Sequence, residues 1–144
     1  MTTTDHTRAP SVLFVCVRNG GKSQMAAGLM RHAAHGRITA HSAGTDPGTT
    51  INALSAETLA EVGVDISGES PKPIHPALLD EVDLVVTLGR EAHVDAPAGT
   101  PVQNWDTDEP SERGIDGIER MRLLRDDISV RVSTLIAELA SVDR

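Results

Sequence analysis

The fold is decided by residues 11–36, which read SVLFVCVRNGGKSQMAAGLMRHAAHG. Residues 11–15 form a nearly continuous apolar run, as is typical of a strand buried on both faces. From about residue 23, apolar side chains recur at the spacing of an amphipathic helix, which we expect to end near Gly36. The segment therefore predicts a strand, a glycine-containing loop over residues 16–23 and a helix in direct succession.

The rest of the chain continues this alternation. Apolar runs predict three further strands, over residues 38–42, 84–88 and 101–105. Helical spacing predicts two further helices and one or two isolated helical turns, over residues 52–62, 118–139 and 77–81 respectively. Asn52 is the expected N-cap of its helix, and Gly63 is expected to follow the C-terminus. Strands that alternate with helices predict an α/β fold whose parallel sheet is covered on both faces.

Size and charge restrict the function classes. The 144 residues suit one domain, which we expect over residues 11–144, preceded by a loose polar tail over residues 1–10. The N-terminus lacks the features of a signal peptide, and no apolar run approaches the ~18 residues of a membrane span. We therefore expect a cytoplasmic protein. The net charge of −8 disfavours nucleic acid and anionic membranes as partners, because phosphate contacts need a basic face.

Cysteine and aromatic residues are scarce. Cys16 is the one cysteine of the sequence, so neither an intrachain disulfide nor a cysteine-cluster metal site can form, and we expect no metal site. The aromatic residues are Phe14 and Trp105, with no tyrosine, which leaves little to grip an aromatic ligand by stacking. Eleven of the thirteen basic residues are arginine, and the two lysines are Lys22 and Lys72.

The loop over residues 16–23 has the composition of an oxyanion cradle. A helix that begins directly after it points free backbone N–H groups and the positive end of its dipole into the loop, and Gly20 and Gly21 permit the turns that this needs. Cys16 stands at the carboxyl end of the strand, where such sheets place their sites. The N–H groups, Lys22 and the Ser23 hydroxyl would stabilise a thiolate and make it a nucleophile.

Two other interpretations of this loop are weaker. Cys16 would be a buried structural thiol in most contexts, but its place at the mouth of the loop disfavours that role. Gly21-Lys22-Ser23 also matches the end of a nucleotide-binding P-loop. That motif requires glycine where Cys16 stands, and residues 84–88 lead into Gly89 rather than into a magnesium-binding aspartate. Nucleotide hydrolysis is therefore disfavoured.

Residues 14–26, FVCVRNGGKSQMA, closely resemble the active-site loop of arsenate reductases related to low-molecular-weight protein tyrosine phosphatases. The likeness continues, in the same order, through residues 42–45, 62–67, 83–88 and 105–110, and it covers about residues 11–141. The resemblance implies a three-layer sandwich with a four-stranded parallel sheet flanked by helices. It also implies a cysteine nucleophile, Cys16, and an acid on a late loop. The oxyanion-binding loop would comprise Val17, Arg18, Asn19, Gly20, Gly21, Lys22 and Ser23.

Two departures from the family pattern bear on the reaction. The family's loop ordinarily ends in Arg-Ser, whereas this chain has Lys22-Ser23, a point charge in place of a planar fork. Thioredoxin-coupled members carry resolving cysteines in and after the segment that corresponds to residues 88–93, and this chain has none there. The resemblance therefore implies an external thiol as co-substrate, mycothiol, with a mycoredoxin- or glutaredoxin-like reductase as partner and no tightly bound cofactor.

The general acid has two candidates. The family usually has aspartate directly before proline, and this chain has Glu109 there, with Asp108 one residue earlier. The register from Trp105 favours Glu109 and the residue type favours Asp108, to which we give preference. The acidic loop would otherwise be a solvated surface run. Asn19 is expected to hold the shape of the loop, and Ser42 to brace it from the neighbouring strand.

The leading hypothesis is an arsenate reductase that acts as an arsenate–mycothiol transferase in arsenic detoxification. Arsenate would bind to loop N–H groups and Lys22, the Cys16 thiolate would attack arsenic, and Asp108 or Glu109 would protonate the departing oxygen. A low-molecular-weight protein tyrosine phosphatase is the alternative, against which the lack of tyrosine argues. The third hypothesis is a non-catalytic oxyanion-binding module that has lost the loop arginine.

Overall fold

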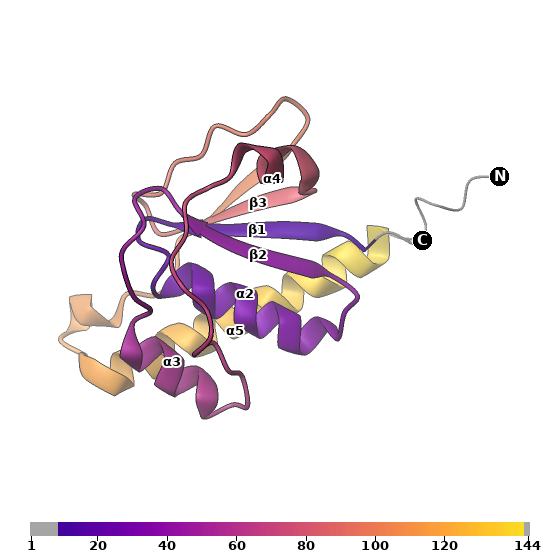
Figure 1. Ribbon diagram of the computed structural model, residues 1–144. Coiled ribbons are helices and arrows are strands. Elements are labelled where there is room, and N and C mark those ends of the chain that lie inside the picture. The colour runs from indigo at the N-terminus through magenta and orange to yellow at the C-terminus, as the bar shows by residue number, and fades with distance from the viewer. Residues whose placement is uncertain (1–8, 143–144) are drawn as a thin grey trace.

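The structure, a computed structural model, describes residues 9–142 and contains one four-stranded sheet. Its strands are β1 (Ser11–Cys16), β2 (Thr39–Gly44), β3 (Leu84–Leu88) and β4 (Val102–Trp105). They lie in the order β2-β1-β3-β4, and each strand runs parallel to its neighbours (Figure 1). The four-stranded parallel sheet that the sequence and the resemblance predict is confirmed.

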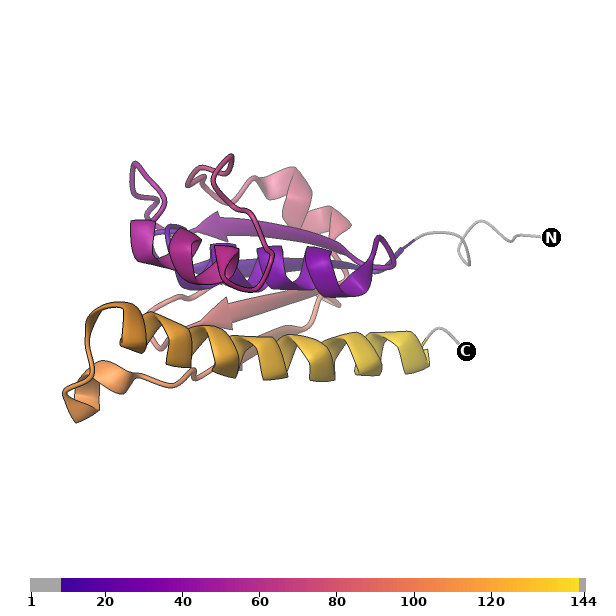
Figure 2. The same ribbon diagram turned by 90° about the horizontal axis from the view of Figure 1, so that it is seen from below.

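The helices cover the two faces of the sheet unequally. They are α2 (Lys22–Ala34), α3 (Ala53–Ala60), α4 (Pro76–Glu81), α5 (Gly117–Val142) and the short 3-10 helix η1 (Pro110–Arg113). α2, α3 and α5 lie on one face and α4 lies on the other, which gives the three layers (Figure 1). Figure 2 shows α5, the longest helix, running alongside α2. No helix within residues 9–142 combines the length and apolar character needed to cross a membrane.

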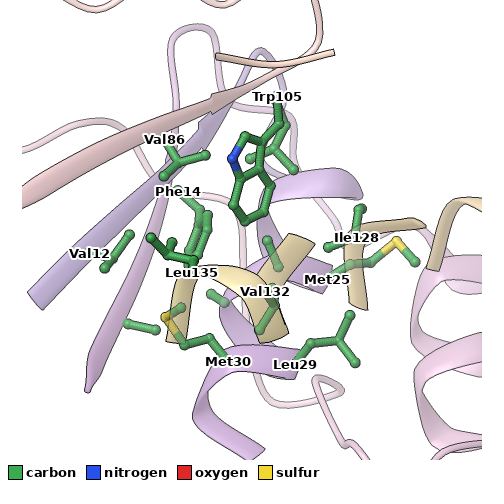
Figure 3. Packing of buried hydrophobic residues seen from close by; sticks show 14 of the residues in the cluster. Val12, Phe14, Met25, Leu29, Met30, Val86, Trp105, Ile128, Val132 and Leu135 are labelled. Atoms are coloured by element: carbon green, nitrogen blue, oxygen red, sulfur yellow. The ribbon is translucent and has the colours of Figure 1, made fainter. Parts of the chain in front are cut away.

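The larger part of the core lies between the sheet and the paired helices α2 and α5. Alternate residues of β1 contribute to it, and Phe14 packs on Trp105 with ring centroids 5.5 Å apart (Figure 3). α5 contributes a buried stripe at helical spacing, comprising Met121, Leu124, Ile128, Val132 and Leu135. Trp105 is therefore a core residue. Burial of such side chains contributes roughly 1.5–3 kcal/mol each, which fixes β1 and α2, and with them the loop between them.

The other face of the sheet carries a smaller apolar cluster. Leu13 and Val15 of β1 pack there with Val85 of β3, under residues of α4 and of the segments that flank it. β1 is thus buried on both faces, as its continuous apolar run predicts. The expected tail over residues 1–10 lies outside the described residues except for Ala9 and Pro10, whose carbonyl accepts from the Thr39 N–H over 2.8 Å.

The two ends of α3 agree with the capping residues that the sequence predicts. Asn52 caps α3, since its side chain accepts from the Ser55 N–H over 2.9 Å, and Gly63 adopts a positive φ of 82° just beyond. β2 extends to Gly44, two residues past the predicted end, because it pairs with β1 up to Cys16. η1 is not predicted, because four residues carry no periodic apolar signal.

The strand order positions the site. β1 and β3 are neighbours, and the connection after β1 leads to β2 on one side while the connection after β3 leads to β4 on the other. Ligands of open parallel sheets bind at such a switch point, beyond the carboxyl ends of the strands. Cys16 ends β1 and Gly89 directly follows β3, so both lie at this edge of the sheet.

Candidate active site

The Cys16 sulfur lies at the base of the loop that connects β1 to α2. The backbone N–H of Asn19 donates to Cys16 Sγ over 3.2 Å, and Ser23 Oγ lies 2.9 Å from the same sulfur. Gly21, the N-cap residue of α2, provides no side-chain cap, so the dipole of a 13-residue helix begins at the loop without a local acceptor. Donors and the helix dipole therefore converge where a thiolate would form.

The carbonyl groups of the loop are turned outward and held by the segment after β2. Backbone N–H groups of that segment donate over 2.8–3.1 Å to four loop carbonyls: Thr45 to Cys16, Asp46 to Val17, Gly48 to Arg18 and Asn52 to Gly20. A peptide whose carbonyl faces away from the loop centre presents the N–H of the next residue toward it. This frame therefore prepares the backbone for an anion.

Asn19 is the central strut of the loop. It is fully buried and adopts a left-handed φ of 54°, which asparagine tolerates better than most residues. Its Nδ2 donates to Ser23 Oγ over 2.7 Å, and its Oδ1 accepts from the Lys72 N–H over 3.0 Å. Gln24 Nε2 also donates to Oδ1, over 3.1 Å. These contacts support the proposed role of Asn19 in holding the loop.

The side chain of Ser42 is linked to the loop through Lys72. Its buried hydroxyl accepts from Lys72 Nζ over 3.1 Å, while the Lys72 backbone holds Asn19. Burial lowers the pKa of Lys72, with opposing and reinforcing effects of Glu69 and Arg31. The pattern of the sequence does not predict Lys72 as a partner, because it lies 53 residues from Asn19 along the chain.

A cavity of about 420 Å³ opens above Cys16. Its walls are the loop, the segment after β3 and the segment around η1, and it is lined by Cys16, Val17, Lys22, Leu88, Gly89, Arg90, Glu91, Asp106, Glu109, Ser111 and Glu112. Four of these residues are acidic and two are basic, and Arg90 is paired with Asp106 over 3.2 Å. The oxyanion loop is therefore reached through an acidic entrance that contains no aromatic lining residue.

Glu109 lines the same cavity as Cys16 and is held by two cations. Lys22 Nζ pairs with Glu109 Oε1, and Arg120 donates to Oε2 over 3.4 Å. Burial alone would raise the pKa of Glu109, but the hydrogen bonds and charges of Lys22 and Arg120 outweigh it and lower that pKa below 4.5. The two cations therefore favour the carboxylate form of Glu109.

Asp108 points elsewhere. Arg113 grips both of its carboxylate oxygens, over 2.7 and 3.2 Å, and its backbone N–H donates to Asp127 over 2.9 Å. The hydrogen bond from Arg113 lowers the pKa of Asp108. Asp108 does not line the cavity, whereas Glu109 does. The geometry is at odds with our preference for Asp108, because η1 turns the chain directly after Glu109 and brings Arg113 back onto Asp108.

Arg18 lies on the outer side of the loop. Its guanidinium is exposed and pairs with Asp46 over 3.0 Å, so it lines the neighbouring surface rather than the cavity above Cys16. Besides Lys72, Gln24 and Arg120 are site residues to which the sequence analysis gave no role. Gln24 stands within the quoted loop motif, which was the available signal, whereas Arg120 has no local signal.

Comparison with known proteins agrees with this geometry. Residues 11–143 match the low molecular weight phosphotyrosine protein phosphatase family. The chain is 30% identical over 132 residues to a glutaredoxin arsenate reductase of Synechocystis, covering 90% of this chain and 98% of that protein. It is 34% identical over 129 residues to an arsenate reductase of Shouchella clausii, covering 84% and 91%.

A solved structure, that of a thioredoxin-dependent arsenate reductase of Corynebacterium glutamicum, superposes with a TM-score of 0.80 at 31% identity. The match covers 94% of this chain and 64% of the Corynebacterium chain, so this chain spans somewhat less than two thirds of that protein. The loop of Cys16, the acid opposite it and these relatives together show that the chain belongs to the low molecular weight phosphotyrosine protein phosphatase family, within its group of arsenate reductases.

Proposed function

We propose that this arsenate reductase is an arsenate–mycothiol transferase, with Cys16 as its nucleophile and Glu109 as its general acid. The observation that carries the proposal is a cysteine in a prepared oxyanion loop, in a sequence that has no second cysteine to resolve it. The relatives named for thioredoxin and glutaredoxin show that redox partners vary within the group.

In the first step, arsenate occupies the loop on backbone N–H groups and Lys22. The Cys16 thiolate attacks arsenic, so that a sulfur–arsenic bond forms as an arsenic–oxygen bond breaks. Glu109 gives its proton to the departing hydroxyl, which leaves as water. Glu109 must be protonated for this, and the charge of a bound oxyanion beside it favours the protonated form.

In the second step, the thiolate of mycothiol attacks arsenic and restores the Cys16 thiolate. The product is a thiol–arsenate adduct in which arsenic is still pentavalent. A mycoredoxin-like dithiol then attacks the sulfur of this adduct. Arsenite leaves with arsenic reduced by two electrons, and the two sulfur atoms become a mixed disulfide. Because mycothiol is a cytosolic thiol, the reaction implies a cytoplasmic location.

The entrance of the cavity favours an uncharged thiol. Glu91 and Glu112 stand there as exposed carboxylates in addition to Glu109, and they would repel a thiol with a net negative charge, such as glutathione. Mycothiol carries sugar and inositol hydroxyls in place of the carboxylates of glutathione. The exposed carboxylates can accept hydrogen bonds from such hydroxyls.

Coupled assays test the proposal. Arsenate with thioredoxin and its reductase should give no sustained NADPH oxidation, because no intrachain disulfide can form for thioredoxin to reduce. Mycothiol with a mycoredoxin should support multiple turnovers, and Cys16→Ser should abolish them while leaving the melting temperature nearly unchanged. Sustained turnover with thioredoxin alone would refute the transferase assignment.

Phosphotyrosine hydrolysis is the second candidate, because the Cys16 and Glu109 pair suits either ester or arsenate chemistry. The absence of an aromatic wall among the lining residues disfavours it. Hydrolysis of p-nitrophenyl phosphate measured beside arsenate consumption decides between them. A non-catalytic module would bind phosphate yet perform neither reaction.

A further inference from the structure

Glu109 stands between two cations that come from different helices. Lys22 is the first residue of α2 and takes Oε1, and Arg120 lies in the first turn of α5 and takes Oε2. The three side chains are largely shielded, with exposed fractions of 19% for Lys22, 26% for Glu109 and 32% for Arg120. The carboxylate therefore depends on both partners for its stabilisation.

An oxyanion in the loop would compete with Glu109 for the ammonium group of Lys22. A Cβ added at Gly89, on the opposite wall, would lie 3.7 Å from Lys22 Nζ, so the ammonium group extends across the cavity rather than into the loop. An oxyanion bound in the loop would draw this ammonium group away from Glu109 Oε1. Binding of the oxyanion therefore exposes Oε1 of a shielded carboxylate.

Arg120 has an unused donor beside this carboxylate. Its Nε is buried and has no hydrogen-bond partner among the described residues, while its two terminal nitrogens contact Glu109 and the sulfur of Met121. Buried donors without partners are rare in folded proteins and call for a physical reason. The Nε and one terminal nitrogen of a guanidinium form the fork that takes a carboxylate through both oxygens.

We propose that Arg120 is the positioning residue of Glu109: when Lys22 turns to the oxyanion, the carboxylate shifts from one donor of Arg120 to both, and it stays there until it takes up the proton that its role as general acid requires. The inference deepens the proposed function by naming what holds its general acid beside the bound anion. Glu109 would then pair with both Lys22 and Arg120 in the free enzyme and with Arg120 alone when the loop binds an oxyanion. A carboxylate left unpaired in this shielded place would oppose anion binding by desolvation and by repulsion.

Calorimetric titration with inorganic phosphate tests the exchange without any arsenate turnover, so its outcome is separable from that of the coupled assays. Arg120→Gln should weaken phosphate binding about threefold to tenfold, since the freed carboxylate loses its charge-assisted partner. Glu109→Gln should strengthen binding, because Lys22 is released. In the Glu109→Gln background, Arg120→Gln should have no more effect than the matched control Arg122→Gln, which removes the same charge from the same helix.

Arg120→Lys keeps the positive charge but lacks the paired donors of the guanidinium, so it should recover part of the phosphate affinity that Arg120→Gln loses. Such a recovery would also show that the packing at this position tolerates a substitution. Equal weakening by Arg120→Gln in both backgrounds would mean that Arg120 attracts anions only as a distant charge, and would overturn the proposal. Unchanged affinity of Arg120→Gln in the otherwise native protein would overturn it as well.

Discussion

The backbone N–H of Asn19 donates to the Cys16 sulfur over 3.2 Å. Asn19 has a left-handed conformation, which its buried side-chain hydrogen bonds maintain. The protein's own hydrogen bonds therefore hold the loop in shape around the sulfur, which limits the reorganisation that the reaction requires.

Replacement of Asn19 tests this preparation. Asn19→Ala should lower the free energy of unfolding in urea by about 2–4 kcal/mol, through lost buried hydrogen bonds and a left-handed conformation that alanine tolerates poorly. Phosphate should then protect Cys16 from alkylation far less well. Asn19→Gly removes the same bonds without the conformational cost, so it should be the more stable of the two variants. If both variants kept native protection by phosphate, the strut assignment would fail.

Gly44 tests the close approach of β2 to the loop. A Cβ there would lie 2.7 Å from the Val17 carbonyl oxygen and 3.0 Å from the Asn19 Cβ, so Gly44→Ala must displace the loop backbone. We expect arsenate turnover to fall at least tenfold, because a displacement of even ~1 Å in a catalytic constellation has that order of cost. Gly68→Ala is the control, since its Cβ would meet nothing within 4 Å. Native activity of Gly44→Ala would show that the loop tolerates the shift.

Lys22 is the position at which the chain departs from the family's arginine. Lys22→Ala should weaken arsenate binding roughly 10- to 150-fold, the equivalent of a lost charge-assisted contact of ~1.5–3 kcal/mol. We expect Lys22→Arg to bind arsenate well but to slow the transfer to mycothiol, because the planar fork fills space that the incoming thiol needs. Single-turnover measurements separate binding from transfer. Undiminished thiol-dependent turnover of Lys22→Arg would contradict the expectation.

The ion pairs of Glu109 make the stability of the protein depend on pH. The pKa of Glu109 is lowered in the folded state, so its contribution is present above the unfolded value and disappears as the pH falls through the lower, folded value. Glu109→Gln should therefore be less stable than the native protein at pH 7. The difference should vanish at pH values well below 4.5, as measured by urea unfolding across that range. A difference that grew on acidification would reverse the assigned direction.

The fold could be predicted from the sequence because the patterns that indicate its strands and helices are local. The apolar run before Cys16, the cap at Asn52 and the spacing of the last helix each depend on residues close in the chain, and each is confirmed. Parallel strands joined by helices then leave few ways to build the sheet. The oxyanion loop was accessible for the same reason, since its glycines and its cysteine are adjacent.

The part of the site around Glu109 could not be predicted from local patterns in the sequence. Asp108 and Glu109 are adjacent and chemically alike, and what separates them is the turn of η1, which gives Asp108 to Arg113. Arg120 and Lys22 meet Glu109 across 11 and 87 positions of sequence. Pairing over such separations depends on the packed positions of α2 and α5, and no local pattern encodes it.

A single sulfur nucleophile also determines how the protein withstands peroxide. Oxidation would convert Cys16 to a sulfenic acid, and its own 144 residues offer no neighbouring thiol to condense with it. Recovery then requires an outside thiol to form a mixed disulfide, with loss of water, and a second thiol to release the cysteine. A cellular thiol that accepts arsenic, as proposed above, would in this way also repair Cys16, so depletion of that thiol would stop both the transfer of arsenic and the repair of the nucleophile.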